Sequence, residues 1–169
     1  MTTRTACHTT FLALLLLWGL QPAPAVAQEE PEMNIVEIVE NTPRLSVLNR
    51  VLQASGMKDS LRTGGPYTMF LPVNEAFYEL PYAERSLLWD TSNRARIRRI
   101  LSNHILDRRM TSEEMAARSN IPSRLEDLPV DTTGNLIQVK GANILQPDVE
   151  AVNGMVHVID AILMPSYVE

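Results

Sequence analysis

The chain has 169 residues, of which 45% are hydrophobic, and a formal net charge of −5 at pH 7. This length allows one domain with a substantial core and is too short for two comfortable domains. The acidic balance argues against nucleic acid as the main partner, because binding to phosphates needs a basic surface.

The first 27 residues have the pattern of an export signal. Arg4 precedes an apolar run from Phe11 to Leu20, and Ala25-Val26-Ala27 matches a signal-peptidase cleavage site. The apolar run has about half of the roughly 20 residues that are needed to span a bilayer. We therefore expect cleavage near Ala27 and a mature protein that is periplasmic or secreted and not membrane-spanning.

Cleavage at this site changes the charge and the redox chemistry of the chain. It leaves 14 basic and 20 acidic residues, a net charge of −6, and it removes the only cysteine, Cys7. The exported domain then has no disulfide, so its stability must come from its core. This pattern favours a bacterial periplasmic or secreted protein. Residues 28–33 are polar and predict a linker, and residues 34–166 predict the domain.

The first part of the domain shows helix signals. A short helix is expected from Asn34, followed by a stronger one that has Thr42 as N-cap, Pro43 at its first position and Gly56 just past its end. Residues 58–65 are interpreted as a loop, because a Gly-Gly-Pro turn follows.

A strand and further helices come next. Residues 67–71 have high β-propensity, and Asn74 is a good N-cap for a short helix after them. A second helical piece begins at Pro81. Residues 92–106 carry the clearest helical stripe of apolar side chains, and residues 113–118 predict a weak helix.

The end of the chain changes to a period of two. Regular structure is expected to stop at Ile121-Pro122, and strands are expected at residues 130–132, 136–140 and 144–146. The apolar run from Met155 to Ile159 predicts a strand that is buried on both faces. Helices first and a β-meander last predict an α+β domain, in which the strand at 67–71 joins the later sheet.

Two histidines remain after cleavage, His104 and His157, and both lie among apolar positions. A zinc site needs three or four protein ligands, and no HExxH-like spacing supplies them. No G-x-S-x-G motif marks a nucleophile. We therefore predict buried, neutral, hydrogen-bonded imidazoles, and no catalytic residue, metal site or cofactor.

Arginines form the one local charge anomaly in this acidic chain. The group comprises Arg94, Arg96, Arg98 and Arg99, with Arg108-Arg109 beyond the predicted helix. Arginine forks match sulfate and phosphate geometry, so an anionic glycan or a lipid headgroup is one candidate partner. A solvated helix face with intrahelical ion pairs is the alternative that we favour.

Two segments resemble the signatures of the fasciclin domain. Residues 68–77, TMFLPVNEAF, resemble T-x-F-x-P-x-N-x-A-F, and residues 153–160, NGMVHVID, resemble N-G-x-x-H-x-I-D followed by a short apolar strand and Pro165. The matching positions are Thr68, Phe70, Pro72, Asn74 and Phe77 in the first signature, and Asn153, Gly154, His157 and Asp160 in the second. Residues 101–106 resemble the central histidine helix of the family, and the whole resemblance covers about 34–165.

This resemblance implies a twisted, wedge-like β-sandwich flanked by several helices, and a role in adhesion or extracellular association without catalysis. In animal members, an Asp-Ile pair before the second signature and a Tyr-His pair on the central helix are associated with integrin-dependent adhesion. The matching positions here are Asp148-Val149 and Asn103-His104, where valine replaces isoleucine and asparagine replaces tyrosine.

Two functions remain open at this point. The first is an exported association module that binds a protein or a glycan at the cell surface. The second is a carrier of an apolar small ligand such as a carotenoid, which a wedge between helices and sheet would admit, with some of the eight methionines lining an adaptable groove.

Overall fold

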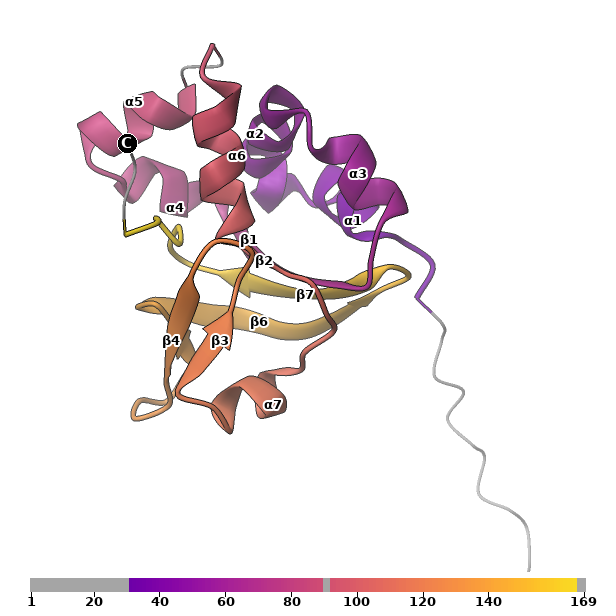
Figure 1. Ribbon diagram of the computed structural model, residues 1–169, viewed down its shortest axis with the longest axis vertical. Helices are drawn as coiled ribbons and strands as arrows, with labels where there is room; N and C mark the ends of the chain where they lie inside the picture. Colours follow the sequence, from indigo (N-terminus) through magenta and orange to yellow (C-terminus); the bar gives the residue numbers. More distant parts are fainter. Residues whose placement is uncertain (1–30, 90–91, 167–169) are drawn as a thin grey trace, which may run out of the picture.

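A layer of helices lies on one side of a curled, seven-stranded sheet in the computed structural model of the protein (Figure 1). The structure describes residues 31–89 and 92–166, so the predicted export signal and the first half of the predicted linker, residues 28–30, lie outside the described residues. The helices are α1 (Ile35–Asn41), η1 (Pro43–Leu45), α2 (Ser46–Ser55), α3 (Lys58–Thr63), α4 (Asn74–Glu79), α5 (Tyr82–Trp89), α6 (Arg94–Ser102) and α7 (Ser112–Ala116). The strands are β1 (Tyr67–Pro72), β2 (Ile105–Leu106), β3 (Asn120–Pro122), β4 (Asp127–Asp131), β5 (Gln138–Val139), β6 (Ala142–Ala151) and β7 (Gly154–Ile159).

The strand order is β2-β1-β7-β6-β5-β4-β3. The pair β1 and β7 is parallel, with Phe70 opposite His157, and the other pairs are antiparallel. The sheet folds back on itself, because the amide of Arg124, between β3 and β4, donates to the carbonyl of Ile105 in β2 at 2.9 Å. Figure 1 shows β3 and β4 crossing in front of β6. The predicted α+β class and the wedge-like, two-layered sheet are confirmed.

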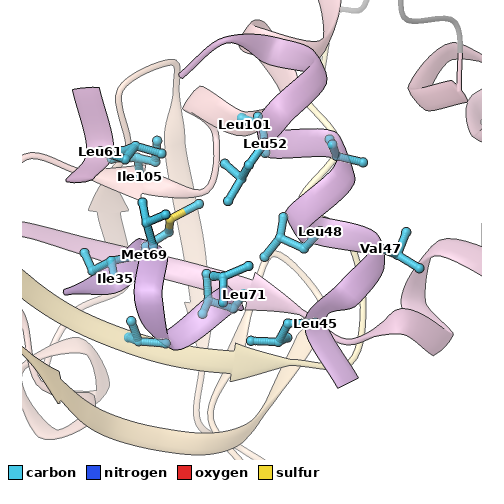
Figure 2. Close-up of a cluster of buried hydrophobic side chains, with 14 of the residues drawn as sticks. Ile35, Leu45, Val47, Leu48, Leu52, Leu61, Met69, Leu71, Leu101 and Ile105 are labelled. Carbon is cyan, nitrogen blue, oxygen red and sulfur yellow. The ribbon is translucent and has the colours of Figure 1, made fainter. Parts of the chain in front are cut away.

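Two hydrophobic cores result from this folding. The first lies between the helices and β1 and β7, and Figure 2 shows its central side chains. They include Ile35, Leu48, Leu52, Leu61, Met69, Leu71 and Leu101. The second core fills the fold of the sheet and includes Phe70, Leu106, Met110, Met115, Ile121, Leu128, Ile144 and Ile159. Side chains of β1 contribute to both cores, because successive side chains of a strand point to opposite faces.

Several boundaries differ from the sequence predictions. Residues 58–63 form the helix α3 instead of a loop, and its Leu61 is buried in the first core. Residues 120–122 form β3, where regular structure was expected to stop. The helix α6 ends at Ser102, so His104 lies just beyond it. The strand β6 runs to Ala151 instead of ending near residue 146. For α3, β3 and β6, tertiary packing or strand pairing overrides a local turn signal, whereas α6 ends early because Ile105 and Leu106 pair with β1 as the strand β2.

Candidate functional site

The signature asparagine Asn74 caps a helix other than its own. Its side-chain oxygen accepts from the amide of Val47 at 2.9 Å, and its side-chain nitrogen donates to the carbonyl of Pro43 at 3.1 Å. Its own helix α4 has Val73 at the N-cap, without a side-chain hydrogen bond. The predicted cap Thr42 instead donates its hydroxyl to the Ile38 carbonyl at 2.6 Å. Asn74 therefore ties the end of β1 to the start of α2.

Asn153 has a similar role at the turn between β6 and β7. Its side-chain oxygen accepts from the amide of Ile35 at 2.9 Å, and its side-chain nitrogen donates to the carbonyls of Leu61 at 2.7 Å and Gly64 at 3.0 Å. One side chain thus joins the turn to α1 and to the segment after α3. The neighbouring position must be glycine, because a Cβ at Gly154 would clash with the carbonyl oxygen of Tyr67.

Other signature residues also serve the backbone or the cores. Thr68 donates its hydroxyl to the carbonyl of Arg108 at 2.6 Å, and Asp160 accepts from the amide of Asn143 at 2.8 Å. The side chains of Phe70, Pro72 and Phe77 are buried. Of these residues, Asp160 is half-buried and the others are buried.

His104 is a buried, neutral imidazole. Its Nδ1 donates to the carbonyl of Ile100 at 2.9 Å, and its Nε2 accepts from the amide of Leu163 at 3.0 Å. Burial lowers the pKa of His104 to about 4, against the opposing effect of the bond to Ile100. The ring therefore connects the segment after β7 to the end of α6 by hydrogen bonds.

Asn103 belongs to a polar cluster beside His104. Its amide nitrogen donates to the carbonyl of Leu163 at 2.9 Å and to a carboxylate oxygen of Glu126 at 3.1 Å. Burial of Glu126 is outweighed by hydrogen bonds from Lys140 and Ser166, which lower the pKa of its carboxyl to about 2. Sequence reasoning missed Glu126, since its partners come from three distant segments and leave no local pattern. Asn103 is 0% and His104 2% exposed.

The pair Asp148-Val149 lies elsewhere, in a β-bulge of β6. The register pairs Gln146 with Val158 and Val149 with Val156, so Pro147 and Asp148 together oppose the single residue His157. The backbone of Asp148 has φ = 55°, the left-handed region that a non-glycine residue rarely occupies. Asp148 is exposed, and Val149 is half-buried.

Three hydrogen bonds hold Asp148 in this conformation. Its amide donates to Nδ1 of His157 at 3.2 Å. Its carboxylate accepts from the amide of Ser112 at 2.7 Å and from the Ser112 hydroxyl. Sequence reasoning missed Ser112, although Thr111 and Glu114 form a capping box that marks the start of α7.

The predicted arginine group divides between two places. Arg94, Arg98 and Arg99 are exposed on α6, and Arg96 is half-buried. Arg98 donates from Nε to the carbonyl of Ser55 at 2.7 Å, at the C-terminal end of the neighbouring helix α2. Beyond β2, a guanidinium nitrogen of Arg109 donates to the carbonyl of Ala151 at 2.6 Å, close to the second signature.

Other features of the described residues bear on ligands and membranes. A hollow of about 210 Å³ is lined by Asp107, Arg108, Pro122 and Ser123. Within residues 31–89 and 92–166, no three His, Cys, Asp or Glu side chains are grouped so that they could hold a metal ion. Of the helices that the structure describes, none combines the length and apolar character needed to cross a membrane.

Comparisons with known proteins agree with the signatures. The profile of the fasciclin domain matches residues 43–165. An uncharacterized protein of Synechocystis is 35% identical over 133 residues, which cover 78% of this chain and 97% of that protein. A second Synechocystis protein is 28% identical over 139 residues, 82% of this chain and 77% of that protein.

A longer relative and a solved structure extend this likeness. The transforming growth factor-beta-induced protein ig-h3 of Sus scrofa is 32% identical over 136 residues, which cover 80% of this chain and 20% of ig-h3. A FAS1 domain pair from the insect cell adhesion molecule fasciclin I superposes with a TM-score of 0.69 at 24% identity, covering 80% of this chain and 52% of that chain. The solved structure supports the fold, and this chain spans about half of it.

Proposed function

The chain belongs to the fasciclin domain family, and we propose that it is an exported, non-catalytic association module. It binds a protein or a glycan at the cell surface or in the periplasm. Fasciclin domains generally lack catalytic activity and occur in adhesion-related proteins, and one solved relative comes from an insect cell adhesion molecule. The predicted export signal supports the location.

The bulge at Asp148 is the observation that carries this proposal. An exposed carboxylate stands beside a half-buried valine. Ser112 donates to this carboxylate, and the backbone amide of Asp148 donates to His157, so both are ordered before any partner binds. A contact surface that is already ordered loses less conformational entropy on binding. Asn103 and His104 are buried and hydrogen-bonded, so we restrict the proposed contact to Asp148 and Val149.

Affinity capture tests this proposal with a matched pair of variants. The mature domain is immobilised and exposed to the solubilised envelope of the source organism. Asp131→Ala is the control for Asp148→Ala, because Asp131 is also exposed and accepts local hydrogen bonds, from the amide and hydroxyl of Thr133 at 2.8 and 2.7 Å. We expect Asp148→Ala to lower capture about tenfold or more and Asp131→Ala to leave it unchanged. Equal capture by the wild type and both variants would overturn the assignment of the surface.

The α6 arginines are a second, separable proposal. Arg94 and Arg99 are exposed and could contact a sulfated or phosphorylated glycan, whereas Arg98 is engaged with Ser55. Retention on heparin at low and moderate salt measures this binding. If the double variant Arg94→Glu and Arg99→Glu elutes at the same salt concentration as the wild type, the arginines have no such role.

Two observations bear on the carrier function. Four methionines, Met69, Met110, Met115 and Met155, are buried, the first three of them within the two cores. The hollow beside Asp107 measures about 210 Å³, which is below the roughly 300–1,000 Å³ of ordinary small-molecule pockets. A coloured preparation with an extractable pigment after native purification would favour the carrier function.

A further inference from the structure

His157 lies inside the fold, directly behind the proposed contact surface. A change in its protonation would therefore act on that surface. We propose that His157 and Ser112 are positioning residues for Asp148, and that protonation of His157 releases the bulge and so weakens association in acid. The part that concerns association rests on the proposed function. The part that concerns the bulge can be measured on the isolated protein.

The hydrogen bonds of His157 require its neutral form. Nε2 donates to the carbonyl of Met110 at 3.0 Å, and Nδ1 accepts from the amide of Asp148 at 3.2 Å. A neutral imidazole has one donor and one acceptor and satisfies both groups, whereas an imidazolium has two donors. After protonation, an N–H at Nδ1 would therefore point at the N–H of Asp148.

The groups around the ring determine how it responds to a proton. His157 is 0% exposed, and the ring of Phe70 in β1 lies 5.7 Å from it, between centroids. The carbonyl of Met110 faces the ring from the segment before α7, and Asp148 faces it from β6. The Arg108 guanidinium donates to the Met110 sulfur. Burial lowers the pKa of His157 below its ordinary value of 6.5, while the bond to Met110 and the charge of Asp148 oppose this shift.

The carboxylate of Asp148 offers the imidazolium a new partner. In the neutral state this carboxylate accepts from the amide and hydroxyl of Ser112. An imidazolium at the same bulge is a charged donor, and charge-assisted hydrogen bonds are stronger than neutral ones. The carboxylate would then turn from Ser112 to His157, the start of α7 would lose its bonds to β6, and the left-handed backbone of Asp148 would relax. The contact surface would lose its fixed shape.

A nuclear magnetic resonance titration of the wild-type protein from pH 7.5 to 4.5 tests the bulge directly. We expect the amide signals of Asp148 and Ser112 to shift with the same midpoint as the imidazole signals of His157. His157→Gln removes the titrating group and should abolish this midpoint. Three results would overturn the proposal: shifts that persist unchanged in His157→Gln, amides that stay fixed while His157 titrates, or a His157 that stays neutral down to pH 4.5. The wild-type titration decides the matter even if the variant folds poorly.

A second measurement connects the bulge to association. Capture of the solubilised envelope is compared at pH 7.5 and at a pH below the His157 midpoint that the titration finds, with the expectation of an about tenfold loss in acid for the wild type and no loss for His157→Gln. Ser112→Ala should raise the midpoint of the Asp148 amide shift, whereas Ser86→Ala, which removes an exposed helical hydroxyl, should not. If capture depends on Asp148 but not on pH, the acid response fails and the proposed function stands. If the amides respond as expected and Asp148→Ala captures normally, the proposed contact surface fails and the bulge mechanism stands.

Discussion

Replacing Asn153 with alanine should cost more stability than any other single polar substitution at this turn. The side chain makes three hydrogen bonds of 3.0 Å or less, to Ile35, Leu61 and Gly64. Alanine would leave all three backbone groups without this partner in a partly buried place. A net value of about 1 kcal/mol for each bond gives a loss of about 3 kcal/mol in the free energy of unfolding. For a domain of this size, the melting temperature should fall by about 10 °C.

Urea denaturation followed by circular dichroism measures this loss. Asn41→Ala is the matched control, because Asn41 is exposed and its amide reaches only the sulfur of Met33, at 3.5 Å. The control should stay within about 0.5 kcal/mol of the wild type. Asn153→Asp keeps the acceptor for Ile35 but sets a charge against the carbonyls of Leu61 and Gly64, so it should also destabilise. A change of less than 0.5 kcal/mol for Asn153→Ala would refute the reasoning.

Three further predictions concern stability. Asn74→Ala should cost about 1 to 2 kcal/mol in urea denaturation, because α2 loses a cap that comes from another element, and an unchanged midpoint would contradict this. Arg98→Ala should cost about 1 kcal/mol, because it removes a cation and its hydrogen bond to the Ser55 carbonyl at the C-terminal end of α2, whereas Arg99→Ala on the same helix should cost nothing measurable. Acid should destabilise the fold. The pKa of His104 is about 4 when folded and 6.5 when unfolded, so the unfolded state binds more protons as the pH falls below 6.5. This stability is fully present above pH 6.5, and up to about 3 kcal/mol is lost by pH 4. Glu126, with a folded pKa of about 2, adds a loss of the same sign below its ordinary value of 4.5. Equal unfolding free energies at pH 7 and pH 4 would show that His104 is not held neutral.

Local patterns were sufficient wherever the partners are close in sequence. Asn34 caps α1 with a full capping box, because Glu37 is three residues away. Gly56 closes α2 in the left-handed conformation with φ = 69°, as a glycine after an apolar stripe predicts. The two signatures, residues 68–77 and 153–160, were sufficient for the fold, since each combines a strand with the turn that ends or begins it.

Long-range partners could not be read in this way. Asn74 was expected to cap its own helix, yet the amide that it accepts from is 27 residues away. The amide bound by the side chain of Asn153 is 118 residues away. In β6, Pro147 and Asp148 have the composition of a turn, and only pairing with β7 shows that they form a bulge within one long strand. A single sequence contains no signal for these pairings, because they depend on how distant segments meet.

Asp148 differs from the signature residues in one respect that bears on function. Asn74, Asn153 and His104 connect backbone segments inside the fold, so their replacement should act through stability. Asp148 is hydrogen-bonded to the buried His157 and is exposed at the same time. Removing its carboxylate should therefore affect association more than stability, since hydrogen bonds that are open to water contribute little to folding. Asp148→Ala could instead lower the unfolding free energy as much as Asn153→Ala, with capture falling only in proportion to the unfolded fraction. That result would show that Asp148 stabilises the fold and has no separate role in association.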